Sequence, residues 1–327
     1  MKVRFTPLIL SFVLGALVAP LAAQAQEAGK VFRVGWLDPF DVAAGLQAPF
    51  VRELRELGYT EGRNLRLEVR KADWKLERLP ELGAALANLN VDLIVAYTDP
   101  AILAAKRATN AIPIVMVGSS DPVGAGFVAS LGRPGGNVTG VTDAAAEIAG
   151  KQLELLKEVS PRVSRVTLLF RSGGKSAPVL EQTRAAAQAL GITLVLMEVW
   201  VRKDVERAFA AVTRERMNAL MVLSRGLMDV SSLNLIGQLA RKHKVPVMSD
   251  EVKLTYEGGL MSYATSYAPQ ARRAAQYADR ILKGSKPADL PVEQPTEFEL
   301  TLNLETARAL GLTVPPSVRL RANKVIE

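Results

Sequence analysis

Six short polar loops contain the residues best suited to binding a ligand. Each loop follows an apolar run of strand length, and several come directly before a segment of helical periodicity. They are Asp38-Pro39-Phe40-Asp41, Tyr97-Thr98-Asp99-Pro100, Gly118-Ser119-Ser120-Asp121, Arg171-Ser172-Gly173, Ser224-Arg225-Gly226 and Ser249-Asp250-Glu251. Backbone N–H groups at a helix start favour a carboxylate, and an Asp side chain suits an ammonium group. Because Ser, Thr and Asp before a helix are commonly plain N-caps, we infer a ligand cleft only from the six loops together.

Residues for catalysis or metal binding are few. The chain has no cysteine and one histidine, His243, which lies in the basic stretch Arg241-Lys242-His243-Lys244. This composition excludes a thiolate nucleophile and a Cys-ligated zinc, and it leaves a Ser-His-Asp triad without a well-placed base. Gly124-x-Gly126-x-x-Ala129 loosely matches a dinucleotide fingerprint, but six residues separate it from the apolar run that ends at Val117. We expect no enzyme, no cofactor and no metal, with an exported hydrolase that uses paired carboxylates as the alternative.

The N-terminus has the parts of a secretory signal peptide. Lys2 and Arg4 form a short basic region, residues 7–18 are almost all apolar, and Ala23-Gln24-Ala25 is a small-x-small cleavage site. The apolar run is shorter than the roughly 20 residues that span a bilayer. We therefore expect residues 1–25 to be removed, a mature chain that begins near Gln26, and a periplasmic location.

The charge of the mature chain argues against a nucleic-acid partner. Removal of residues 1–25 takes away Lys2 and Arg4 and lowers the formal charge from +8 to +6. The remaining Lys and Arg residues are interspersed with Asp and Glu and form no long basic run. Interspersed charge is typical of a solvated surface. We expect a monomer with a small-molecule ligand.

The elements that must position the six loops are predicted by alternating patterns. Val/Ile/Leu-rich runs of strand length occupy residues 33–37, 65–69, 91–96, 112–117, 166–170, 193–199, 219–223 and 245–248. Longer segments between them repeat apolar residues at spacings of three and four, as in Ala43, Leu46, Phe50, Leu54 and Leu57. Continuous apolar runs suit parallel strands covered on both faces. The fold class is therefore α/β, with repeated βα winding.

The winding falls into two blocks, which predicts two Rossmann-like, doubly wound lobes joined by a hinge. We expect lobe 1 to comprise residues 31–142 with a return of about 264–294. Lobe 2 then comprises residues 143–263 with a return of about 295–327. Mature chains of about 300 residues commonly divide in this way.

Three stretches resemble one bacterial family of ABC-transporter substrate-binding proteins. The first runs from Asp121-Pro122-Val123-Gly124 through Gly126-Phe127-Val128-Ala129-Ser130-Leu131 to Arg133-Pro134-Gly135-Gly136-Asn137-Val138-Thr139-Gly140. The second is Leu57-Gly58-Tyr59 with Glu61-Gly62 and Asn64. The third is Ile281-Leu282-Lys283-Gly284, 287–295, Phe298-Glu299-Leu300 and Ala309-Leu310-Gly311-Leu312. Together they extend the resemblance over essentially the whole mature chain.

The resemblance implies a type I periplasmic binding protein with three crossovers between its lobes and an ABC permease as partner. Some relatives bind aromatic amino acids such as tryptophan. This chain departs from many relatives at Tyr97-Thr98-Asp99, where a small Gly-Thr pair is common, and we expect the bulky ring and the acid to reshape the pocket. A ligand-presenting sensor protein for a membrane receptor would share all these features.

We expect a carboxylate-bearing solute, an amino acid or aromatic acid, held between the lobes. Asp99 or Asp121 is a candidate for its ammonium group, and Arg171 or a helix N-terminus for its carboxylate. The predicted ligand contacts are Phe40, Tyr97, Thr98, Asp99, Ser119 and Asp121 in lobe 1 and Arg171, Ser172, Ser224, Asp250 and Tyr263 in lobe 2. The aromatic members of this set are candidates for stacking contacts.

Overall fold

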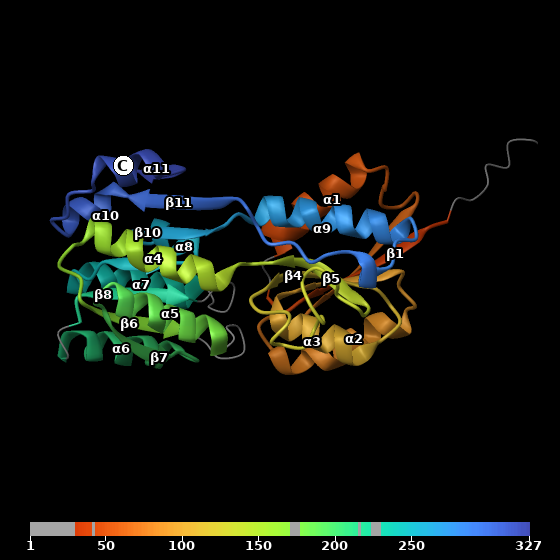
Figure 1. Ribbon diagram of the computed structural model, residues 1–327, viewed down its shortest axis with the longest axis horizontal. Coiled ribbons are helices and arrows are strands. Elements are labelled where there is room, and N and C mark those ends of the chain that lie inside the picture. Colours follow the sequence, from red (N-terminus) through yellow and green to blue (C-terminus); the bar gives the residue numbers. More distant parts are fainter. Residues whose placement is uncertain (1–29, 41–42, 171–176, 215–216, 224–229) are drawn as a thin grey trace, which may run out of the picture.

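The computed structural model describes residues 30–40, 43–170, 177–214, 217–223 and 230–327. Over these residues the chain forms two α/β lobes that lie end to end along the long axis (Figure 1). We call the lobe built on the five-stranded sheet the first lobe and the lobe built on the seven-stranded sheet the second lobe. Within the described ranges, no helix is both long enough and apolar enough to cross a membrane.

The first lobe is a parallel sheet between two helical layers. Its strands, in spatial order, are β2 (Leu65–Lys71), β1 (Phe32–Asp38), β3 (Leu93–Tyr97), β4 (Ile114–Ser119) and β5 (Val138–Thr142). Helices α1 (Ala43–Glu56) and α9 (Tyr267–Leu282) cover one face (Figure 1). The other face is covered by α2 (Leu79–Asn88) and α3 (Thr98–Ala108), and the short turns η1 (Leu76–Arg78) and η2 (Pro287–Asp289) complete the lobe.

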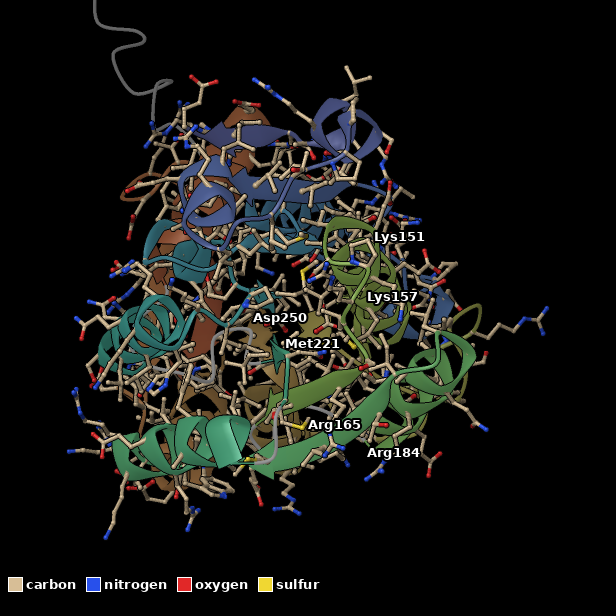
Figure 2. All side chains as sticks on the ribbon, turned by 90° about the vertical axis from the view of Figure 1, so that its left-hand side faces the viewer. Lys151, Lys157, Arg165, Arg184, Met221 and Asp250 are labelled. Carbon is tan, nitrogen blue, oxygen red and sulfur yellow. The ribbon has the colours of Figure 1, made fainter. Side chains whose placement is uncertain are left out.

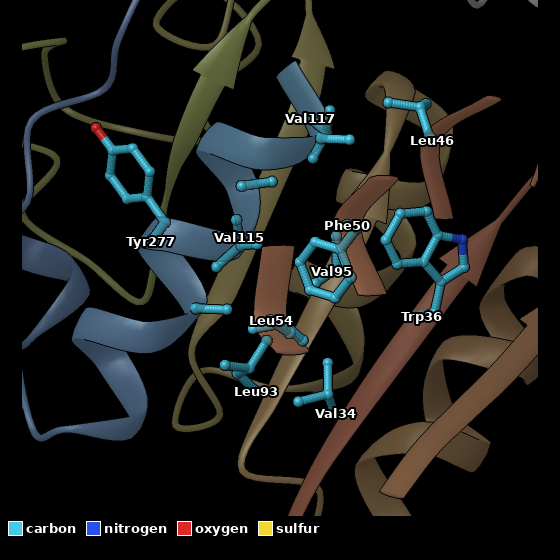
Figure 3. Close-up of a cluster of buried hydrophobic side chains, with 14 of the residues drawn as sticks. Val34, Trp36, Leu46, Phe50, Leu54, Leu93, Val95, Val115, Val117 and Tyr277 are labelled. Atoms are coloured by element: carbon cyan, nitrogen blue, oxygen red, sulfur yellow. The ribbon is translucent and has the colours of Figure 1, made fainter. Parts of the chain in front are cut away.

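The core of the first lobe explains why its strands are apolar on both faces. On the face covered by α1 and α9, Trp36 packs on Phe50 with ring centroids 5.1 Å apart (Figure 3). Val95 and Val115 continue this layer from the neighbouring strands. Because successive strand residues point to opposite faces, both alternate sets are buried here and the sequence reads as a continuous apolar run.

The second lobe is a larger sheet with one antiparallel pair. Its strands, in spatial order, are β12 (Lys324–Ile326), β11 (Phe298–Asn303), β10 (Met261–Thr265), β9 (Val247–Ser249), β8 (Ala219–Leu223), β6 (Arg165–Phe170) and β7 (Thr193–Glu198). Only β10 and β11 pair in the antiparallel sense among the described strands. One face packs on α4 (Ala145–Val159), α5 (Ala177–Ala189), α10 (Leu304–Ala309) and α11 (Pro316–Arg321), and the other on α6 (Arg202–Arg214), α7 (Val230–His243) and α8 (Val252–Tyr256).

Three crossovers connect the lobes. Asp143 and Ala144 lead from β5 into α4, Ser266 leads from β10 into α9, and residues 294–297 lead from the first lobe into β11 (Figure 1). Helix α9 therefore packs against α1 although it follows a strand of the second lobe. The C-terminal segment consequently passes from one lobe to the other, as the resemblance implied.

The predicted strands are all present, with ends that differ by at most two residues from the predicted ranges. Strand β5 was not predicted, because its residues Val138-Thr139-Gly140-Val141-Thr142 contain a glycine and resemble a linker. Gly140 has φ +135°, and a Cβ there would lie 2.1 Å from the carbonyl oxygen of Met116. Only glycine allows β4 and β5 to approach this closely.

Candidate functional site

The crossovers determine which ends of the strands face the other lobe. Strand β5 runs directly into α4 of the second lobe, and β10 runs directly into α9 on the first lobe. Since the neighbouring strands are parallel to β5 or to β10, the carboxyl ends of both parallel sets face the gap between the lobes. Open α/β sheets bind ligands at these ends.

Three cavities lie around this gap. The hinge cavity, of about 230 Å³, is bounded by Ser266 and residues 294–297 of the crossovers and by Arg273 of α9 and Glu293. The interlobe cavity, also of about 230 Å³, has walls from both lobes that include Gly45, Asp250 and Thr301. The rim cavity, of about 200 Å³, lies between residues that include Asp121, Glu147 and Gln294.

The loops after β3 and β4 are joined at the first-lobe wall. Ser119 donates a hydrogen bond from Oγ to Oδ1 of Asp99 at 2.6 Å. Thr98, the first residue of α3, has φ +65°, a conformation that β-branched residues rarely adopt. Its Oγ1 donates to the carbonyl oxygen of Tyr97 at 2.6 Å, which offsets part of the strain. Because Thr98 and Asp99 are consecutive and Ser119 is hydrogen-bonded to Asp99, the predicted trio forms one structural unit. Strained residues such as Thr98 cluster at ligand sites.

A row of aromatic rings connects this wall to the start of α9. The ring centroid of Phe40 lies 4.7 Å from that of Trp74 and 6.5 Å from that of Tyr97. The Tyr97 ring lies 6.5 Å from that of Tyr267 in an edge-to-face arrangement. Phe40 and Tyr97 are each 1 % exposed, whereas Trp74 and Tyr267 are partly exposed. Phe40 and Tyr97, which were predicted as ligand contacts, therefore lie beneath Trp74 and Tyr267, whose rings are partly exposed.

Asp121 holds a turn at the rim of the first lobe. Its Oδ1 accepts a hydrogen bond from the backbone N–H of Gly124 at 2.8 Å. A Cβ at position 124 would lie 2.0 Å from Oδ2 of the same carboxylate, so any other residue there would require the Asp121 side chain to move. Nearby, Asp143 accepts from the N–H of Ala145 at 3.0 Å and from Oγ of Ser120 at 3.2 Å. These hydrogen bonds fix the carboxylates beside the rim cavity.

The second-lobe wall is acidic. Asp250, at the end of β9, is 5 % exposed and lines the interlobe cavity. The next residue, Glu251, caps α8 by accepting from the N–H of Lys253 at 3.3 Å. Tyr267 donates from its hydroxyl to Oε2 of Glu251 at 3.4 Å, so this contact spans the two lobes.

Figure 2 shows the second lobe from its outer end. Asp250 lies near the middle of the lobe, while Lys151, Lys157, Arg165 and Arg184 lie to one side of it (Figure 2). None of these four cations lines the interlobe cavity.

The remaining predicted contacts lie elsewhere. Tyr263 stacks on Phe298 at a centroid distance of 5.7 Å and packs against the core on the α4 side of β10. Burial raises the pKa of its hydroxyl. The structure thus separates Tyr263 from Ser262 and Ala264, which line the interlobe cavity. Arg171, Ser172 and Ser224 lie outside the described residues.

Side chains of α9 tie the three crossovers together. Gln270, 3 % exposed, donates from Nε2 to the carbonyl oxygen of Thr142 at 3.3 Å and to Oγ1 of Thr265 at 3.0 Å. Arg273 forms a bidentate ion pair with Glu293, which lowers the pKa of that carboxyl. The backbone of Glu293 in turn pairs with β5 through the N–H of Thr142 at 2.9 Å.

Trp74, Tyr267 and Ser262 were not predicted as site residues. Tyr267 follows a strand and begins a helix, like the predicted loops, and this pattern would have identified it. Trp74 gives no such signal because only the tertiary fold brings it to Phe40. Among the described residues, no group of three or more His, Asp or Glu side chains could hold a metal ion.

A model of the ABC transporter substrate binding protein family matches residues 44–326. The chain belongs to this family. It is 27% identical over 264 residues to a tyrosine-binding protein of Clostridioides difficile, and the match covers 80% of this chain and 75% of the relative. The predicted family is therefore confirmed.

Two solved structures share the fold of this substrate-binding protein. A conserved domain protein of Vibrio cholerae superposes with a TM-score of 0.84 at 27% identity, over 90% of this chain and all 100% of the other. An ABC domain of Streptococcus pneumoniae, solved with L-Trp bound, superposes with a TM-score of 0.81 at 25% identity, over 90% and 99% of the two chains. The predicted two-lobed α/β fold of a type I periplasmic binding protein is confirmed.

Proposed function

We propose that this substrate-binding protein captures an aromatic amino acid between its lobes and delivers it to the permease of an ABC importer. The observation that carries the proposal is the interlobe cavity and its surroundings, where aromatic rings, carboxylates and helix N-termini of both lobes lie close together. Tyr267 is its central residue, because it contacts Tyr97 of the first lobe and Glu251 of the second. The similarity to a tyrosine-binding protein and to an L-Trp complex supports the same ligand class.

The two ends of the amino acid require different partners. Backbone N–H groups at the start of α3, near Thr98 and Asp99, suit the carboxylate, as the sequence predicted for a helix N-terminus. The ammonium group is suited to the acidic second-lobe wall at Asp250, or to Asp99 and Asp121 of the first lobe. An aromatic side chain is suited to the Tyr267 ring.

Closure of the hinge would bring these groups together. A ligand that contacts both lobes stabilises the closed arrangement, and the permease recognises that arrangement. The lobe boundaries that we propose are 31–142 with 264–294, and 143–263 with 295–327. They are supported by the short crossovers and by the packing of α9 against α1.

Export is part of the proposal. A signal peptide of residues 1–25 would direct the chain to the periplasm, where such proteins meet their permeases. The mature protein would act as a monomer, since one chain supplies both walls of the gap.

Calorimetry on purified protein tests the proposed function. L-Tyr and L-Trp should bind with micromolar or lower Kd, and neutral sugars and polyamines should not bind. A hundredfold excess of ligand over Kd should raise the free energy of unfolding by about 2.7 kcal/mol. Small-angle scattering should show a smaller radius of gyration for the complex.

Two tyrosine variants provide a matched comparison. Tyr267→Leu should weaken binding roughly tenfold, because it removes a ring from the gap. Tyr256→Leu should leave binding unchanged, because Tyr256 is 59% exposed on α8 and lines none of the three cavities. Tight binding of a sugar in place of the amino acids, or equal effects of the two variants, would refute the assignment.

A further inference from the structure

Two buried hydroxyl-bearing residues lie side by side in the lining of the interlobe cavity. Ser262 on β10 and Thr301 on β11 both line it, and the two residues are direct partners in the antiparallel register. Directly opposed residues of an antiparallel pair project from the same face of the sheet, about 5 Å apart at Cβ. Ser262 is 1% exposed and Thr301 is 0% exposed.

The Thr301 hydroxyl lacks a partner. Its Oγ1 is buried and makes no hydrogen bond with any residue that the structure describes. Most buried polar side-chain atoms in proteins are hydrogen-bonded, and leaving one unpaired is unfavourable. A valine has nearly the same shape and would avoid this cost. The hydroxyl is therefore explained if a ligand completes its hydrogen bonding.

The other walls of the cavity indicate the shape of that ligand group. Val252, Ala264 and Ala268 supply aliphatic contacts, and Tyr267 supplies a ring at the side that leads to the first-lobe wall. The volume of about 230 Å³ is enough for a six-membered or an indole ring. The charged residues in the lining are Asp250 and the ion-paired Glu299 and Lys324. A lining that combines apolar, hydroxyl and charged groups suits a flat apolar group with a polar atom at its far end.

We propose that this cavity receives the side chain of the bound amino acid, and that Thr301 and Ser262 select a ring with a hydrogen-bond donor at its far end. A phenol hydroxyl or an indole N–H meets this requirement, and the unsubstituted ring of phenylalanine does not. The inference rests on the proposed function and adds a basis for specificity to it. A site built to bind a polar group discriminates against the analogue that lacks it, because the site's own polar atoms then stay unpaired.

The test compares the affinities of L-Tyr, L-Trp and L-Phe for the full mature chain by calorimetry. Wild-type protein should bind L-Tyr at least about tenfold more tightly than L-Phe. Thr301→Val should lower the L-Tyr affinity about tenfold and leave the L-Phe affinity unchanged or improved, so that the Tyr/Phe ratio falls towards one. Ser262→Ala should lower the same ratio by a smaller factor.

Thr255→Val is the matched control. The Oγ1 of Thr255 is also buried and without a partner among the described residues, but Thr255 lies in α8 and does not line the interlobe cavity. This variant should keep the wild-type Tyr/Phe ratio. Neither valine variant should lower the melting temperature of the ligand-free protein, because each removes an unpaired hydroxyl.

The outcomes separate this inference from the proposed function. Binding of L-Tyr with the same Tyr/Phe ratio in wild type, Thr301→Val and Ser262→Ala would overturn the role of the hydroxyls and leave the proposed function standing. An equal change of ratio in the control would also overturn it. Failure of the wild type to bind any of the three amino acids would overturn both.

Discussion

Substitution of Gly140 by alanine tests whether the close approach of β4 and β5 is as strict as the geometry indicates. The new Cβ would lie 2.1 Å from the carbonyl oxygen and 2.8 Å from the nitrogen of Met116, both of them backbone atoms that cannot rotate away. Gly140 also has φ +135°, which other residues avoid. The strained backbone costs about 1–3 kcal/mol and the overpacking a further 1–3 kcal/mol. The expected loss of unfolding free energy is therefore roughly 2–6 kcal/mol.

Thermal unfolding followed by circular dichroism measures this loss. For a protein of this size, each kcal/mol lowers the melting temperature by about 2–4 °C, so Gly140→Ala should melt roughly 5–20 °C below wild type. Gly136→Ala is the matched control, since no atom lies within 4 Å of its added Cβ and its φ is not positive. The control should stay within about 0.5 kcal/mol of wild type. If Gly140→Ala melted within about 2 °C of the control, the steric reasoning would be wrong.

Two further predictions concern titratable groups. Tyr59 is 6% exposed and donates to Asp279 at 3.0 Å, and burial together with that carboxylate raises its pKa to about 12. The difference between ultraviolet titrations of wild type and Tyr59→Phe should therefore show a phenolate that forms near pH 12. The stability from the Tyr59–Asp279 contact should be complete below pH ~10 and lost as the pH rises through 12. A Tyr59 phenolate that formed at pH ~10 would contradict this prediction. Arg273 lowers the pKa of the Glu293 carboxyl, so the pair should stabilise the protein above pH ~4.3 and lose this effect as the pH falls below it. Because the Arg273 and Glu293 side chains are 42% and 37% exposed, Arg273→Met should cost only about 1 kcal/mol at pH 7 and progressively less as acid protonates the Glu293 carboxyl. A cost that did not change with pH would exclude the ion pair as its source.

The strands and the two-lobed architecture were predictable because burial imposes its pattern on the sequence. A parallel strand covered on both faces must be apolar throughout, as at Leu93–Tyr97, and a covering helix must be apolar on one side, as at Ala43–Glu56. Strand β5 escaped prediction because Gly140 meets a tertiary requirement that local propensity does not express.

The candidate site was predictable only in part. The loops at strand ends were found because a polar residue that follows an apolar run is a local signal, as at Ser119, and more so where a helix begins next, as at Tyr97-Thr98-Asp99. The hydrogen bond that joins Asp99 to Ser119 links two separate segments, so the tertiary fold decides it, whereas the turn at Asp121 is closed within one loop. The predicted contacts Arg171, Ser172 and Ser224 stay predictions.

The amino-acid sequence by itself determined the α/β class, the two blocks and the family, because these depend on periodicity and on contiguous motifs such as Asp121-Pro122-Val123-Gly124. The tertiary structure alone decided which rings and hydroxyls share a cavity. Tyr267 meets Tyr97 across 170 residues of chain, and Thr301 becomes the neighbour of Ser262 through an antiparallel pair late in the sequence. Such contacts arise from the packing of the whole chain, since neither residue carries a local mark of its partner.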